Sequence, residues 1–140
     1  MPDEYKDLIN VNQKFYRALD NGNIELMEDV WLKDEYSKCV HPGWPMLVGW
    51  DAIKQSWINI FSSGGPSKIE ISNINSEVSG NVGWITCLEQ ITHRVGEQYQ
   101  IGLAQTTNIF ELHGSKWLIV LHHASPVPFR LTDVPDEKLQ

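Results

Sequence analysis

Residues 68–124 read KIEISNINSEVSGNVGWITCLEQITHRVGEQYQIGLAQTTNIFELHGSKWLIVLHHA, and their pattern is the strongest indication of the fold class. Apolar and polar residues alternate along it, which is the period of a β-strand with one buried face. Three short turn signals, each built around a glycine, divide it into four long segments. The expected strands are Lys68–Ser79, Val82–His93, Gln98–Leu112 and Lys116–Ala124. Short turns between long strands are typical of antiparallel hairpins, so the sequence predicts a four-stranded meander.

The residues before this stretch have the period of helices instead. Apolar residues recur every three or four positions between residues 3 and 21, which predicts a long first helix ending at Asn21-Gly22. A short second helix is expected after Asn23, a short strand at residues 36–40 and a third helix at residues 51–61. Helices followed by a curved antiparallel sheet make an α+β architecture, and helices in the concave face of such a sheet leave a conical pocket.

The composition limits the size of the protein and the kinds of partner it can have. The 140 residues suffice for one domain, which we place at residues 1–128, with a C-terminal tail at residues 129–140. The formal net charge is −7, and no cluster of lysine and arginine is present to bind nucleic acid or an anionic membrane surface. Because we find neither a membrane-spanning apolar run nor a secretory signal, we expect a cytoplasmic location.

The two cysteines, Cys39 and Cys87, are far apart and fit no paired metal spacing. No glycine-rich phosphate loop is present either, so we expect neither a metal nor a cofactor. Cys39 and His41 are two residues apart on one strand face, which makes a Cys–His nucleophile conceivable. The favoured interpretation is that Cys39 is a small buried apolar residue.

His41 stands beside the turn that would border the pocket. Its ordinary pKa near neutrality suits a general base or a hydrogen-bond partner of a ligand, and the alternative is a structural histidine that holds the turn. Trp44, Trp50 and Trp57 crowd the same region. These side chains either form the walls of a pocket for a flat apolar ligand or pack into the core.

His122 and His123 are adjacent in the last predicted strand, so their side chains point to opposite faces and cannot bind one metal ion together. Alternation along the strand places Val120 and His122 toward the pocket. The same alternation places Trp117 and Leu121 on the convex face, where a second copy of the chain would cover them. A homodimer through the convex sheet face is therefore expected.

Polar side chains on the middle strands complete the candidate site. Glu89, on the same face as Cys87, is either an acid or base that faces the pocket or a solvated residue that faces outward, and the outward position is the favoured interpretation. Thr106 and Asn108 add neutral hydrogen-bonding groups. Such groups suit an uncharged polar group of a ligand, for example a carbonyl.

Two blocks of sequence, residues 12–23 (NQKFYRALDNGN) and 107–117 (TNIFELHGSKW), resemble the nuclear-transport-factor-2-like superfamily. The closing block, residues 118–126 (LIVLHHASP), looks like the SnoaL-like subgroup and also resembles the association domain of calcium/calmodulin-dependent protein kinase. The resemblance covers residues 5–128 and implies a cone-shaped fold. The superfamily includes isomerases, cyclases, dehydratases, binding proteins and assembly modules, so the fold alone does not imply one function.

Ketosteroid isomerases of this superfamily use an aspartate base, a tyrosine and a protonated aspartic acid. By their flanking residues, these positions correspond to His41, Phe15 and Asn108. Steroid isomerisation by that mechanism is therefore not expected, and a different proton transfer with His41 as the base stays open. The pocket arginines of the kinase association domain correspond to Cys87 and Asn108, so the resemblance implies no clamp for an anion.

We therefore expect a domain that binds a small apolar or carbonyl-bearing molecule in a conical pocket. The residues leave open whether it also catalyses a cofactor-free proton transfer of the isomerase, cyclase or dehydratase type. The alternative is a non-catalytic homodimeric association module. The expected catalytic residues are His41 as the base and His122 and Asn108 as groups that polarise or position the carbonyl. The expected ligand-binding residues are Phe15, Trp44, Trp50, Trp57, Cys87, Glu89, Thr106 and Val120.

Overall fold

The computed structural model describes residues 2–66 and 68–128, and it confirms the α+β cone predicted from the sequence. The helices are α1 (Pro2–Asn21), α2 (Ile24–Val30) and α3 (Trp50–Ser62). The strands are β1 (Lys38–Val40), β2 (Leu47–Val48), β3 (Lys68–Ser79), β4 (Val82–Val95), β5 (Gln98–His113) and β6 (Lys116–Val127). The sequence pattern does not predict β2, which is only two residues long.

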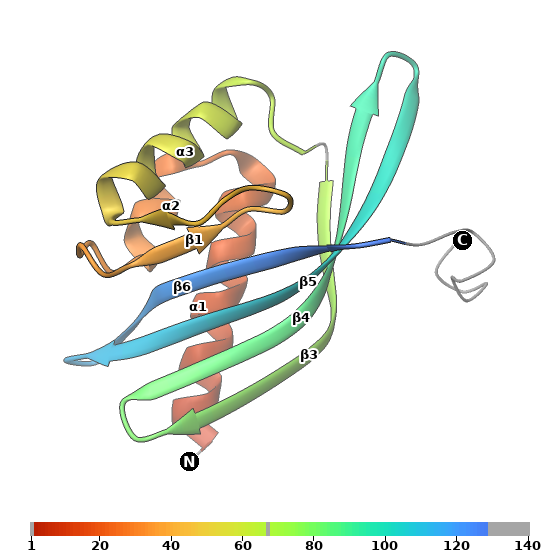
Figure 1. Ribbon diagram of the computed structural model, residues 1–140. Helices are drawn as coiled ribbons and strands as arrows, with labels where there is room; N and C mark the ends of the chain where they lie inside the picture. The colour runs from red at the N-terminus through yellow and green to blue at the C-terminus, as the bar shows by residue number, and fades with distance from the viewer. Residues whose placement is uncertain (1, 67, 129–140) are drawn as a thin grey trace.

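The strands form one curved sheet in the order β2-β1-β6-β5-β4-β3. The four long strands pair antiparallel as the predicted meander. β1 instead pairs parallel with β6, and Cys39 lies opposite His122. Figure 1 shows the helices gathered on one side of the sheet, with α1 running along its concave face. The parallel pairing matters for function because it brings the segment that ends at His41 next to the last strand.

α1 is an amphipathic helix whose apolar side chains face the sheet. Leu8 and Phe15 are fully buried in this interface. The methyl groups of Leu8 lie so close to Gly83 that a Cβ at that position would be 2.9 Å from one of them. The helix ends before Gly22, which has a φ of +62°. Asn23 then caps α2 by accepting a hydrogen bond from a backbone N–H of the next turn.

β6 contains a β-bulge that changes which side chains face the core. Ile109 pairs with Leu121, but Phe110 pairs with Ile119, so Val120 is an extra residue without a partner on β5. As a result both Trp117, at 3% exposed, and His122 point into the concave side. The placement of Trp117 on the convex face, which regular alternation predicts, is wrong.

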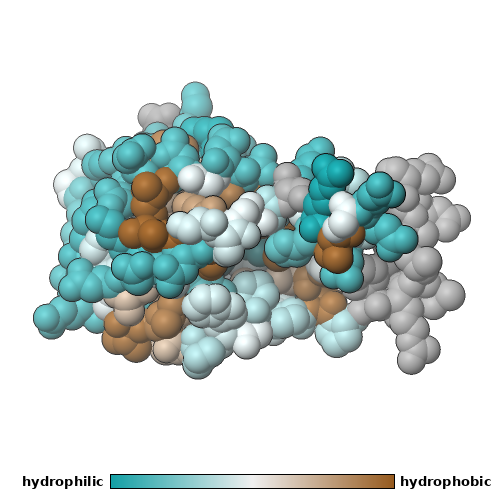
Figure 2. All heavy atoms as spheres, turned by 90° about the horizontal axis from the view of Figure 1, so that it is seen from above, coloured by the Kyte–Doolittle hydropathy of each residue, from teal (hydrophilic) through white to brown (hydrophobic). Residues whose placement is uncertain are grey.

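The hairpin between β4 and β5 extends past the strands on either side of it. β3 pairs with β4 as far as Thr92, and β6 pairs with β5 as far as Leu103. Beyond these points the hairpin stands apart from the body of the molecule (Figure 1), and it carries the exposed side chains of Tyr99 and Ile101. Seen from above, the surface is mostly hydrophilic, with the hydrophobic residues in separate small groups (Figure 2).

The inward position of Trp117 predicts a large loss of stability on truncation. Trp117→Ala should lower the free energy of unfolding by about 3–5 kcal/mol, because it leaves a cavity in the core. Trp84→Ala is the matched control on the opposite face, where the side chain is 37% exposed, and should cost less than about 1 kcal/mol. Urea denaturation of the two variants measures both values. Equal losses would contradict the placement of Trp117.

Candidate functional site

A cavity of about 230 Å³ lies between α1, α3 and the concave face of the sheet. Its polar lining consists of His41, Glu89, His93 and His122. Its larger apolar walls are Leu19, Trp44, Trp57, Ile60, Ile69 and Ile91, and two prolines, Pro42 and Pro66, complete it. The cavity is therefore apolar with a few convergent polar groups, which is the usual character of a small-molecule site.

His41 follows β1 directly and is 3% exposed. Its Nε2 is 2.8 Å from the hydroxyl oxygen of Ser56 on α3. That hydroxyl donates its only proton to the backbone carbonyl of Ile53, at 2.6 Å. His41 must therefore donate from Nε2 to Ser56, which assigns the proton to Nε2 and leaves Nδ1 unprotonated. Burial lowers the pKa of His41 from 6.5 to about 4, so the ring is neutral at pH 7.

His122 is oriented by an amide on the neighbouring strand. Its Nδ1 is 2.6 Å from Oδ1 of Asn108. The orientation of that amide follows from its other end, where Nδ2 donates to Oδ1 of Asn12 at 2.9 Å and to the hydroxyl oxygen of Tyr16 at 3.4 Å. His122 thus donates from Nδ1, and Nε2 is left as the proton acceptor. Burial, with smaller effects of the neighbouring imidazoles, lowers the pKa of His122 to about 3.

Glu89 lies on β4 at the opposite end of the same network, and only 2% of it is exposed. Its Oε2 accepts a hydrogen bond of 2.6 Å from the hydroxyl of Tyr16 on α1. Burial raises the pKa of Glu89, and the Tyr16 hydroxyl and the nearby Thr106 side chain lower it in part. No lysine or arginine is among the groups that shift this pKa. The outward, solvated alternative for Glu89 is wrong.

Aromatic rings enclose the two histidines. The ring of His41 lies 4.5 Å from that of Trp57 and 4.8 Å from that of Trp44, both in edge-to-face geometry. The ring of Phe15 lies 4.9 Å from His122 but does not line the cavity. Trp44 is 42% exposed, so its indole forms both a wall of the cavity and part of the outer surface.

The structure brings five of the residues predicted from sequence to one cavity: His41, Trp44, Trp57, Glu89 and His122. Four others, Phe15, Cys87, Thr106 and Asn108, are buried nearby but are not part of its lining. Because both amide hydrogens of Asn108 are already donated, this side chain can position His122 but cannot polarise a carbonyl. The roles of the others stay predictions.

Two further residues of the predicted site lie elsewhere. Trp50 lines a separate open groove at the start of α3, where its ring lies 6.1 Å from that of Trp31. Val120 is the extra residue of the β6 bulge, is half-buried and does not line the cavity. The bulge explains this error, because it breaks the alternation from which the position of Val120 was predicted.

The sequence pattern missed His93 and the polar residues behind the cavity. His93 continues the face of β4 that carries Glu89 and Ile91, so extending the alternation by one step would have found it. Tyr16 carries no such signal, because its side chain lies on a different face of the helix from Phe15. It becomes buried because α1 is enclosed by the curved sheet on more than one face.

Cys39 is close to His41 without forming a reactive pair. Its sulfur lies 3.7 Å from Nε2 and 3.9 Å from Nδ1 of the ring. Burial raises the pKa of the Cys39 thiol far above its ordinary value of 9, so it stays protonated. A protonated thiol is a poor nucleophile, which favours the interpretation of Cys39 as a small buried residue.

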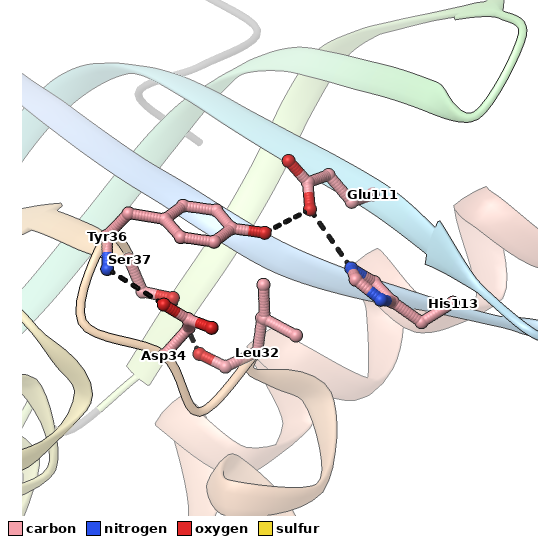
Figure 3. Close-up of polar contacts among 6 residues, drawn as sticks. All are labelled: Leu32, Asp34, Tyr36, Ser37, Glu111 and His113. Carbon is pink, nitrogen blue, oxygen red and sulfur yellow. Dashed lines mark hydrogen bonds and ion pairs between the residues drawn. The ribbon is translucent and has the colours of Figure 1, made fainter.

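A second polar cluster lies outside the cavity, between the segment before β1 and strand β5 (Figure 3). The hydroxyl of Tyr36 donates a hydrogen bond of 2.6 Å to Oε1 of Glu111, and Nε2 of His113 lies 3.0 Å from the same oxygen. The hydrogen bond to Glu111 raises the pKa of Tyr36 to about 12. Ser37 donates to the backbone carbonyl of Leu32 at 2.6 Å in the same loop. These contacts attach the loop that leads to His41 to the sheet.

The comparisons with known proteins agree with this architecture. The profile of the SnoaL-like domain family matches residues 8–130. The chain belongs to this family. A nuclear-transport-factor-2-like protein of Streptomyces avermitilis, provisionally assigned as a dehydratase, is 28% identical and superposes with a TM-score of 0.81, covering 92% of this chain and all of that one. Both the family and the fold predicted from sequence are thus confirmed.

Two other proteins similar to this chain differ widely in what their names describe. A Thiobacillus denitrificans protein, provisionally assigned as a calcium/calmodulin-dependent protein kinase type II association domain, is 24% identical with a TM-score of 0.75 over 84% of this chain and 93% of that one. The F-box protein SKIP8 of Arabidopsis thaliana is 25% identical over 118 residues, which are 84% of this chain and 48% of that protein. The chain thus spans about half the length of this curated relative.

Within the described ranges, no group of three or more histidine, cysteine, aspartate or glutamate side chains is arranged to hold a metal ion. No helix in the described part of the chain is long and apolar enough to cross a membrane.

The lowered pKa of His41 predicts acid sensitivity. Below pH 6.5 the unfolded chain binds a proton at His41 that the folded protein binds only near pH 4. The free energy of unfolding should therefore decrease as the pH is lowered from 6.5 to 4. The contribution of His41 to this decrease is at most about 1.4 kcal/mol per pH unit. Urea denaturation between pH 7.5 and 4.5 measures the slope.

His41→Gln should remove this share of the slope, because glutamine does not titrate and its amide can still donate to Ser56. His123→Gln is the matched control, since His123 is exposed on the other face of β6. It should change the slope by much less than His41→Gln does. The same slope in wild type and in His41→Gln would contradict the buried, neutral state of His41.

Proposed function

We propose that the protein binds a small carbonyl-bearing molecule in the cavity and transfers a proton on it without a cofactor, in a reaction of the isomerase, cyclase or dehydratase type. The observation that carries this proposal is the pair of neutral imidazoles at one apolar cavity. Each uses one nitrogen as a fixed hydrogen-bond donor to the protein interior and keeps the other unprotonated. Each ring therefore presents an unprotonated nitrogen that can accept a proton at neutral pH.

The geometry favours His122 over His41 as the base. The sulfur of Cys39 lies within 4 Å of both ring nitrogens of His41, at 3.7 Å from Nε2 and 3.9 Å from Nδ1, whereas Nε2 of His122 makes no hydrogen bond with the described residues. His122 cannot act as the donor that polarises a carbonyl, because its N–H is directed to Asn108. The expected roles of the two histidines are thus revised: His122 takes the proton, and His41 orients the ligand from the opposite wall.

The proposed step is the removal of a proton from the carbon next to the carbonyl. Nε2 of His122 accepts this proton, the electrons of the C–H bond form an enolate, and a donor in the cavity protonates or hydrogen-bonds the enolate oxygen. Return of the proton to another carbon is an isomerisation. Loss of a hydroxide from the neighbouring carbon, which leaves as water with a proton from the imidazolium, is a dehydration.

Exchange of hydrogen for deuterium next to a carbonyl tests this function. In D₂O the wild-type protein should accelerate the exchange of the α-hydrogens of 2-tetralone, as followed by proton NMR. His122→Asn should reduce this acceleration by about 10²–10⁴-fold, because the asparagine can still donate to Asn108 but cannot act as a base.

The control for this experiment is His123→Asn, which changes the neighbouring exposed residue and should exchange at the wild-type rate. A parallel thermal-shift screen of neutral carbonyl compounds separates binding from turnover, since a ligand at 100 times its Kd stabilises by about 2.7 kcal/mol. Exchange that persists in His122→Asn would exclude it as the base. A screen without any stabilising compound would favour the second candidate function.

The second candidate is a homodimeric association module, and the convex face supports it. Trp84, Ile109 and Leu121 lie in one row across three adjacent strands on this face, and Trp84 is 37% exposed. This row replaces the Trp117 surface expected from the sequence.

Both cysteines are free and buried, which suits the reducing cytoplasm that we propose as the location.

Leu121→Lys should separate such a dimer, because it places a charge in the middle of the apolar row. Analytical ultracentrifugation is expected to show a dimer for the wild type and a monomer for the variant. Lys116→Glu, at an exposed position near the edge of β6, serves as the control for a changed charge. A monomeric wild-type protein would rule out the association module.

A further inference from the structure

We infer that the cavity selects uncharged ligands over carboxylates, and that Glu89 determines this selection by donating a hydrogen bond to the ligand's oxygen. This inference deepens the proposed function and rests on it, because it concerns the ligand of the same cavity. It names a chemical class: a neutral molecule of one or two rings that carries a carbonyl or similar acceptor.

The charge of the lining is the first observation. Among the residues that the structure describes, the lining of the cavity includes neither lysine nor arginine, and its charged or titratable members are three histidines and Glu89. The two fully enclosed histidines already have a fixed donor to the protein interior, so each offers the ligand only an acceptor. Burying a carboxylate among such groups costs several kcal/mol, since neither an opposite charge nor a set of donors compensates its lost hydration.

The direction of the hydrogen bonds is the second observation. The network runs from His122 through Asn108 to Tyr16 and ends at Glu89, with each donor directed to the next acceptor. Tyr16 has one proton, and Oε2 of Glu89 receives it. The carboxyl group thus meets a neutral donor and an apolar wall rather than a cation. In that environment a carboxyl group keeps its own proton and becomes a hydrogen-bond donor.

The pattern of donors and acceptors then describes the ligand. Glu89 offers a donor to an acceptor oxygen, and Nε2 of His122 offers an acceptor to an acidic C–H or O–H group of the same molecule. The volume of about 230 Å³ is larger than the roughly 150 Å³ of a cavity that holds benzene, so one or two fused rings fit. The walls of Trp57, Ile60 and Ile91 suit a flat apolar body.

The test uses 2-naphthamide and 2-naphthoate, two probes of nearly the same shape that differ in charge. Quenching of the fluorescence of the tryptophans at the cavity reports binding at pH 7.5. The wild-type protein should bind the amide at least about tenfold more tightly than the carboxylate. Glu89→Gln should keep this preference, because its amide still donates, whereas Glu89→Leu should weaken binding of the amide by about three- to tenfold.

A variant that gains binding of the carboxylate tests the inference even if the Glu89 variants fold poorly. Ile91→Lys places a cation at the cavity wall and should tighten the binding of 2-naphthoate by about tenfold or more. Gln90→Lys makes the same change in charge on the adjacent residue, which points to the other face of β4, and should leave the preference unchanged.

Each outcome decides a different point. Equal or tighter binding of the carboxylate by the wild-type protein overturns the inference, and the proposed function then stands with an anionic ligand. An unchanged preference in Ile91→Lys also overturns it. Binding of neither probe overturns the inferred ligand class, and the deuterium exchange of 2-tetralone decides the proposed function separately.

Discussion

A chain of buried hydrogen bonds between α1 and the sheet fixes the position of the helix in the cone. Asn12 and Tyr16 on the helix meet Asn108 and Glu89 on the strands, and His122 extends the chain to β6. Each of these groups is nearly inaccessible to water, so each must find its partner inside the protein. A helix shifted by one turn would leave several of them unpaired, at about 1–3 kcal/mol each. The interactions that hold α1 in the cone therefore also orient the side chains of the cavity.

One physical cause sets the charge state of the whole site. Removal from water disfavours every charged form, so it lowers the pKa of His41 and His122 and raises that of Glu89. Burial therefore favours the neutral form of all three groups. In water, free imidazoles would be partly charged and a carboxyl group would be almost fully charged at neutral pH. The apolar walls thus affect the charge state of these side chains as well as the shape of the cavity.

The sequence predicts most of the fold because glycine turns and residue periods are local signals. The four strands of the meander and the three helices follow from them, as does the position of His41 beside its turn. The bulge at Val120 has no local signal, because any residue can occupy it, and Trp117 was therefore placed on the wrong face. The outward position favoured for Glu89 was also wrong, since alternation shows which residues share a face but not which face is buried.

The bulge in β6 acts as a phase shift of one residue between two halves of the same strand. Ahead of it the odd-numbered residues Trp117 and Ile119 face inward, and after it the even-numbered His122 and Ala124 do so. With an unbroken phase, His123 would occupy the cavity in place of His122. The backbone bulge, as well as the order of the side chains, thus determines which histidine faces the cavity. An alignment of SnoaL-like sequences must locate this irregularity before it compares the histidines that follow it.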